Sequence, residues 1–72
     1  MSSTNIEATV TGKVWKVETV PGAQLQEDDV VIILESMKME IPVLAPNAGT
    51  IETILVQEGD SVEEGQTVAT MK

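Results

Sequence analysis

The chain has 72 residues, a formal net charge of −8, and neither cysteine nor histidine. A single domain of this size must be stabilised by regular structure and side-chain packing, because no disulfide or zinc site can form. The acidity disfavours nucleic acid and anionic lipid as partners, and no segment approaches the ~18 apolar residues of a membrane span. The N-terminus lacks the pattern of a signal peptide. We therefore expect a cytoplasmic monomer that binds neither nucleic acid nor membrane.

Short strands separated by turns are predicted along the chain. Residues 1–5 are polar and are expected to be a flexible N-terminus, whereas residues 6–72 are expected to form one domain. Pro21-Gly22 suits a type II turn, because proline pre-sets one backbone angle and glycine tolerates the positive φ that follows. Residues 30–34 and the run Ile41-Pro42-Val43-Leu44 are typical of strands. No stretch has the 3.6-residue period of a helix longer than about one turn.

The second half of the chain repeats the first at an offset of 37 positions. Glycines and aliphatic residues coincide: Gly12 with Gly49, Gly22 with Gly59, Val14 with Ile51, Val17 with Ile54, Leu25 with Val62 and Val31 with Val68. Neither half can bury its apolar face alone, so the halves must pack on each other. This pattern predicts an all-β sandwich or flattened barrel of about eight short strands with pseudo-two-fold symmetry. Gly22, Gly49 and Gly59 are interpreted as sites of positive φ or close backbone approach.

Lys38 lies between the two strand-like runs, at residues 30–34 and 41–44. A short connection between adjacent strands is normally a hairpin, and hairpin tips are exposed and carry function disproportionately. We expect Lys38 to be accessible at one end of the molecule, with both chain termini at the other end.

The segment Glu35-Ser36-Met37-Lys38-Met39-Glu40 resembles the attachment motif of biotinyl domains, the biotin carboxyl carriers, in which the lysine between two methionines is biotinylated. Ala45-Pro46-Asn47-Ala48-Gly49 and the turn at residues 56–62 are also similar to that family, so the resemblance covers residues 6–72. It is greatest to the small free-standing biotin/lipoyl attachment proteins. The resemblance implies a flattened barrel of two four-stranded antiparallel sheets. The "thumb" insertion of the acetyl-CoA carboxylase carrier has no counterpart between Val17 and Leu25.

The resemblance also implies a function. Lys38 would be biotinylated by a biotin protein ligase and would shuttle a carboxyl group between a biotin carboxylase and a carboxyltransferase. Met37 and Met39 are flexible and apolar, which suits recognition by several partners, although packing against the barrel end is the alternative. Glu35 and Glu40 are candidate contacts for the ligase, with an ordinary solvated acidic surface as the alternative.

Catalysis by the chain itself is not expected. The usual bases and nucleophiles are missing, and adjacent acidic residues such as Asp28-Asp29 diverge within a strand or turn, so we predict no catalytic residue and no metal site. Trp15, the one aromatic residue, is expected to pack in the core or to be partly exposed between the sheets in preference to acting as a docking anchor.

Two other functions fit parts of the pattern. A lipoyl carrier shares the expected fold and lysine, but lipoyl domains usually have Asp-Lys-Ala where this chain has Met37-Lys38-Met39. Lipoate, or acceptance of both groups, is therefore the alternative to biotin. A structural adaptor is the other alternative, since similar barrels occur unmodified in membrane-fusion and efflux proteins.

Overall fold

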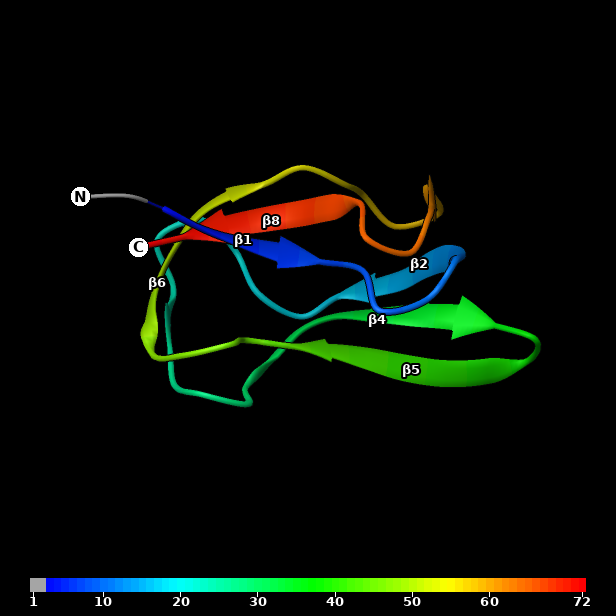
Figure 1. Cartoon of the computed structure of the whole chain (residues 1–72), viewed down its shortest axis with the longest axis horizontal. Helices are drawn as coiled ribbons and strands as arrows, with labels where there is room; N and C mark the ends of the chain where they lie inside the picture. The colour runs from blue at the N-terminus through cyan, green and yellow to red at the C-terminus, as the bar shows by residue number, and fades with distance from the viewer. Residues whose placement is uncertain (1–2) are drawn as a thin grey trace.

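The computed structural model describes residues 3–72 and is built from short β-strands (Figure 1). No residue in this range forms a helix, so none belongs to a helix that could cross a membrane. The strands, in chain order, are β1 Thr4–Glu7, β2 Gly12–Val17, β3 Gln24–Leu25, β4 Val30–Ser36, β5 Met39–Leu44, β6 Gly49–Ile54, β7 Ser61–Val62 and β8 Thr67–Met71.

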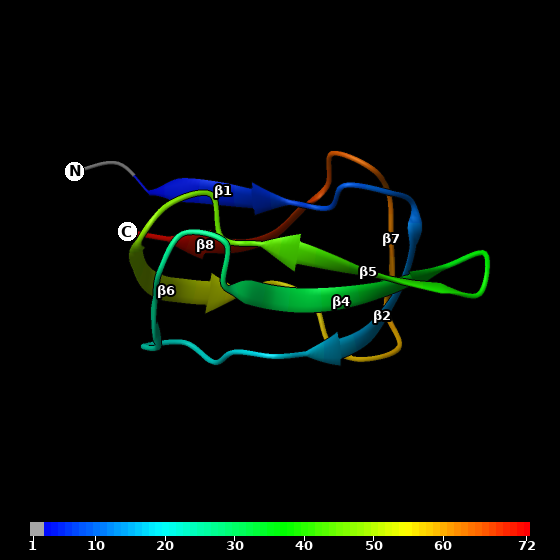
Figure 2. The same cartoon turned by 90° about the horizontal axis from the view of Figure 1, so that it is seen from below.

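The strands form two four-stranded antiparallel sheets, as the sequence predicts. One sheet has the order β1-β8-β6-β3 and the other has the order β5-β4-β2-β7. The 37-residue repeat relates β1 to β5, β2 to β6, β3 to β7 and β4 to β8. Exchanging these counterparts converts the first order into the second, which is the predicted pseudo-two-fold symmetry. Figure 2 shows β5, β4 and β2 side by side, with β6 and β8 belonging to the other layer.

The symmetry extends to individual hydrogen bonds. The backbone N–H of Gln26 donates to Oδ2 of Asp29 at 2.9 Å, and 37 residues later the N–H of Glu63 donates to Oε1 of Gln66 at 3.0 Å. A carboxylate in one half and an amide in the other thus close the same turn, because the turn requires only an oxygen acceptor at that position.

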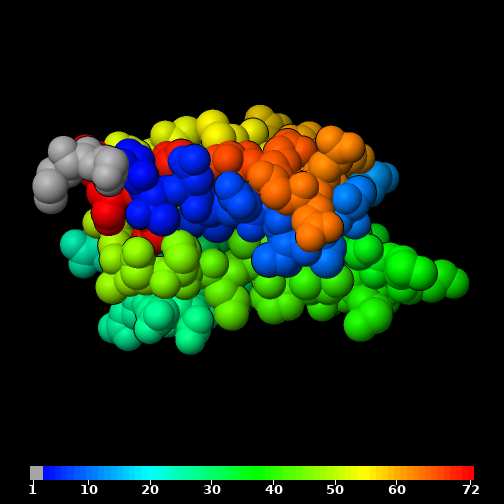
Figure 3. Space-filling view, viewed as in Figure 1, coloured from blue at the N-terminus to red at the C-terminus, as the bar shows by residue number. Residues whose placement is uncertain are grey.

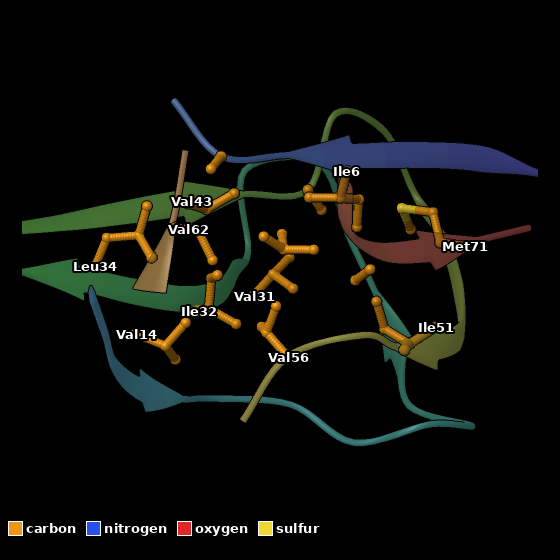
Figure 4. Packing of buried hydrophobic residues seen from close by; sticks show 14 residues of the cluster. Ile6, Val14, Val31, Ile32, Leu34, Val43, Ile51, Val56, Val62 and Met71 are labelled. Atoms are coloured by element: carbon orange, nitrogen blue, oxygen red, sulfur yellow. The ribbon is translucent and has the colours of Figure 1, made fainter. Parts of the chain in front are cut away.

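The core lies between the two sheets and is aliphatic (Figure 4). Its side chains come from both halves of the repeat, so each half covers the apolar face of the other, and burial of this surface is the main stabilising contribution available to a chain of this size. The buried set is Ile6, Ala8, Val14, Val31, Ile32, Leu34, Val43, Ala45, Ile51, Val56, Val62, Val68, Ala69 and Met71.

Two symmetry-related bulges interrupt the alternation of inward and outward side chains. Val31 and Ile32 are adjacent in β4, yet both are fully buried, and the register with β5 shifts between Val30 and Ile32. Val68 and Ala69 occupy the equivalent places in β8 and are also both fully buried. An extra residue on one strand lets two neighbours face the same side, which a strict period of two does not predict.

Thr4 and Met71 pair at one end, and the β4–β5 hairpin projects at the opposite end of a molecule 36 Å long and 17 Å across (Figures 1 and 3). Strand β1 begins at Thr4, which pairs with Met71, so the predicted boundary between residues 5 and 6 falls inside a strand. Met1 and Ser2, the rest of the predicted flexible segment, lie outside the described residues.

Glu52 connects Ser3 and Lys72 to strand β6. Its carboxylate accepts a hydrogen bond from the hydroxyl of Ser3 and lies 3.5 Å from the ammonium of Lys72. The hydrogen bond from Ser3 and the charge of Lys72 lower the pKa of the Glu52 carboxyl. These contacts connect Ser3 and Lys72 to the sheet that lacks the hairpin.

Gly12→Ala is expected to lower the free energy of unfolding by about 2 kcal/mol, because the added methyl group would overlap the backbone carbonyl of Glu35 and force the sheet apart just before the hairpin. Gly22→Ala is the control: its φ of +92° is strained for alanine, but the space around it is open, so the expected loss is about 1 kcal/mol. Urea denaturation measures both values. Equal losses in the two variants would contradict the close approach of β2 to β4.

Candidate attachment site at the hairpin tip

The hairpin that carries Lys38 is tightly built. Strands β4 and β5 pair from Val30↔Leu44 to Ser36↔Met39, so only Met37 and Lys38 form the connecting turn. A two-residue connection holds its central residues in one geometry, because both neighbours are fixed by the strand ladder. The lysine therefore has a defined position at the tip.

Both turn residues have a backbone conformation that is unfavourable for their types. The φ angle is +53° at Met37 and +66° at Lys38. A type I′ turn requires positive φ at both central positions, and Asn-Gly is the sequence that forms it most readily. Each residue with a Cβ in this region costs about 1–2 kcal/mol. Such strain clusters at functional positions, which favours a role for Met37-Lys38 other than stability.

The tip is open to solvent. The exposed fraction is 92% for Met37 and 63% for Met39, and Lys38 is also exposed. The alternative that either methionine packs against the end of the barrel is therefore wrong. Among residues 3–72 the ion pairs are Lys16–Glu18 and Lys72–Glu52, so the ammonium of Lys38 has no carboxylate partner in the described part of the chain.

Glu35 and Glu40 face each other across the hairpin. They are direct partners in the β4–β5 register, and both are exposed. Like charges directly opposite each other are destabilising in an antiparallel pair. Lys13 is the partner of Glu35 on the other side, in β2. The hairpin thus presents a concentrated negative charge two to three residues from the lysine.

A groove of about 530 Å³ borders the hairpin. The sequence did not single out Thr11, Ser61 and Val62, because threonine, serine and valine have no distinctive pattern; only the pairing of β2 with β7 brings them here. The groove is lined by Thr11, Gly12, Lys13, Glu35, Ser36, Met37, Lys38, Ser61, Val62 and Glu63.

Within residues 3–72, no group of three or more acidic, histidine or cysteine side chains converges to hold a metal ion. What the arrangement offers is a solvent-exposed primary amine on a rigid support, which can act as a nucleophile toward an activated carboxyl group supplied by another protein.

The family described as "Biotin-requiring enzyme", the biotin/lipoyl domains, matches residues 1–71. The chain belongs to this family. The Bacillus subtilis "Biotin/lipoyl attachment protein" is 46% identical over 54 residues, which are 75% of this chain and 74% of that protein. A Mycobacterium leprae "Biotinylated protein TB7.3 homolog" is 40% identical over 65 residues, 90% of this chain and 92% of that protein.

A solved structure supports the same assignment. The urea carboxylase of Kluyveromyces lactis matches this biotin/lipoyl domain with a TM-score of 0.94 and 35% identity over the whole chain. The chain spans only 6% of that enzyme. The expected resemblance to small attachment proteins and the expected fold are both confirmed. The chain is thus a carrier domain of the biotin/lipoyl family.

Met37→Asn combined with Lys38→Gly is expected to raise the free energy of unfolding by about 1–2 kcal/mol, because both residues adopt positive φ more easily than the native pair. Chemical denaturation measures the change. Lys38→Arg is the matched control and should leave stability unaltered, since arginine keeps the Cβ. A double variant that is no more stable than the native chain would show that the turn is not strained.

Proposed function

We propose that Lys38 is the residue to which biotin is attached, and that the domain carries a carboxyl group between enzymes. The observation that carries this proposal is the exposed lysine held at positive φ at the tip of a two-residue hairpin. Its amine would attack the carbonyl carbon of biotinyl-adenylate, which a ligase makes from biotin and ATP; the new amide bond replaces the bond to phosphate, AMP leaves and the amine nitrogen loses a proton. When bound, biotin supplies a ring that accepts a carboxyl group from one active site and donates it in another.

Position distinguishes Lys38 from the other lysines. Lys13 and Lys16 lie within β2, where the ladder fixes the backbone, and Lys16 is paired with Glu18 at 3.5 Å. Lys72 is paired with Glu52 at the end that bears the termini. A rigid projection that can enter another protein's active site is available only at Lys38 among the lysines.

Met37 and Met39 support recognition of the tip by more than one enzyme. Both are largely exposed, and methionine is flexible and polarizable, so one side chain can fit surfaces of different shape. Their presence in place of Asp and Ala also supports biotin over lipoate. The name of the Bacillus subtilis relative covers both groups, whereas the Mycobacterium leprae relative is named as biotinylated.

The partners in this proposal are a biotin protein ligase, a biotin carboxylase and a carboxyltransferase. The domain acts as a cytoplasmic monomer that transports its cargo without catalysing either half-reaction. The absence of histidine and cysteine from the chain supports this passive role.

Intact mass tests the proposal. After incubation with a biotin protein ligase, biotin and ATP, the mass should increase by one biotinyl group, and Lys38→Arg should abolish the increase because arginine is not an acceptor. A parallel incubation with a lipoate ligase distinguishes the alternative cargo.

The substitutions Lys13→Arg and Lys16→Arg serve as controls and should leave the modification intact. Modification that persists in Lys38→Arg would refute the assignment of the site. If neither ligase modifies the native chain, the carrier function fails and the structural adaptor becomes the better explanation.

Glu35→Gln and Glu40→Gln should separate stability from recognition. Removing the charge of Glu40 relieves the repulsion across the hairpin, so Glu40→Gln should be more stable by about 0.3–0.5 kcal/mol. Glu35→Gln also loses the attraction to Lys13 in β2, so its stability should change less. If the pair contacts basic groups of the ligase, the rate of biotinylation at low carrier concentration should fall at the same time. Thermal denaturation and a biotinylation time course measure the two effects. An unchanged time course would leave these glutamates as solvated surface residues.

A further inference from the structure

The two sheets have outer faces of opposite character. On the sheet that carries the hairpin, five apolar side chains point outward, and we call this set the outer patch: Trp15, Val30, Ile33, Pro42 and Leu44. Ile33 is half-buried and the other four residues are exposed. Exposed apolar groups that gather on one surface mark interaction sites more often than single scattered ones do.

The strand register brings the members of the outer patch together. Val30 is the partner of Leu44, and Ile33 is the partner of Pro42, on the central and edge strands β4 and β5. Their neighbours Ile32 and Val43 are buried, so the patch residues occupy the opposite, solvent side of the sheet. Figure 2 shows β4 and β5 adjacent along their length.

Trp15 extends the outer patch onto β2. The register between β2 and β4 shifts between Val14 and Lys16, so Trp15 is the extra residue of a bulge and lies beside the Lys16↔Ile33 pair. It is 47% exposed. The sequence predicted a core position or partial exposure between the sheets; instead, the bulge turns this aromatic ring outward, since Val14 takes the inward position.

The internal symmetry shows that the fold does not require this apolar surface. At the equivalent positions of the other sheet, 37 residues away, all five side chains are polar: Glu52 for Trp15, Thr67 for Val30, Thr70 for Ile33, Asn5 for Pro42 and Glu7 for Leu44. These residues have the same backbone environment in the symmetric sheet. The backbone arrangement of this repeat thus accepts polar side chains at all five positions, and the apolar side chains of the outer patch are available for contact with another molecule.

We propose that the outer patch is a docking surface for the biotin protein ligase, an inference that rests on Lys38 being the attachment site. Strands β4 and β5 are the two arms of the hairpin, so the patch lies on the face that leads, past the Glu35–Glu40 pair, to the tip. Before modification, the ligase can reach the carrier only at the lysine side chain, which is short. The surface of the ligase around its active site must therefore lie close to the hairpin. Enzymes that act later reach their cargo through the added biotin arm and are not held so close.

The dimensions are compatible with one continuous contact. Pro42 lies four residues from Lys38 and Leu44 lies six residues away, or about 14 and 20 Å along an extended strand. A standard interface covers about 800 Å² on each partner, so one such contact would occupy most of the outer face of a molecule 36 Å long and 17 Å across. The Glu35–Glu40 pair at the tip and Lys16 at the side border the patch, and an apolar centre with a charged rim is the usual anatomy of a protein interface.

The symmetry supplies matched variants for the test. Trp15→Glu and Ile33→Thr each introduce the residue that the chain already has at the equivalent position. Steady-state biotinylation by a ligase that modifies the native carrier should show KM raised about five- to ten-fold in either variant, with kcat preserved, because truncating a central apolar contact weakens binding by that factor. The reciprocal variant Thr70→Ile, on the polar sheet, should leave both constants unchanged.

Three outcomes separate the explanations. Thermal denaturation and complete biotinylation at saturating carrier establish that each variant is folded with a competent hairpin. Native KM values in both patch variants would overturn the docking surface while leaving Lys38 as the attachment site, whereas failure of the native chain to gain biotin would overturn the attachment site itself. Sedimentation that shows a native dimer and monomeric patch variants would assign the surface to a second copy of the chain and would also overturn the proposal.

Discussion

Burial of each half of the chain against the other is the interaction on which the rest of the structure depends. Neither half has a core of its own, and the buried set draws on both halves of the 37-residue repeat. The sheets interleave the halves, since β8 and β6 pair with β1 and β3, while β4 and β2 pair with β5 and β7. Consequently the hairpin is supported by strands from both halves, and its tip is fixed only when the whole domain has folded.

The duplicated fold also explains where the hairpin of Lys38 lies. The junction between the halves of the repeat is the connection from β4 to β5, which is the hairpin that carries Lys38. One end of the barrel has this projecting hairpin, and Ser3 and Lys72 contact Glu52 at the other end. A symmetric body with one asymmetric tip is well suited to presenting a single attachment point.

Much of this arrangement could be predicted from the residues. The repeat indicated two packed halves, and the aliphatic runs on either side of Lys38 indicated the hairpin, because period and turn chemistry are local properties. The bulges at Val31 and Trp15 could not be predicted, since an extra residue in a ladder depends on the partner strand. The sequence did not decide whether Met37 and Met39 are exposed, because methionine is normally buried. The hairpin is long enough to place both side chains away from the core.

The two-residue turn has a mechanical consequence for a carrier. In a long flexible loop the backbone of the attachment residue would be mobile. Here the strand ladder extends to the Ser36↔Met39 pair, so the backbone of the turn is fixed on both sides. Any group attached to Lys38 thus moves about a fixed backbone position. The volume that this group can reach is centred on that position at the end of the barrel. Each enzyme would have to place its active site within reach of the attached arm. The length of the arm therefore limits the distance between the two active sites, and the rigid domain limits the directions from which each enzyme can approach.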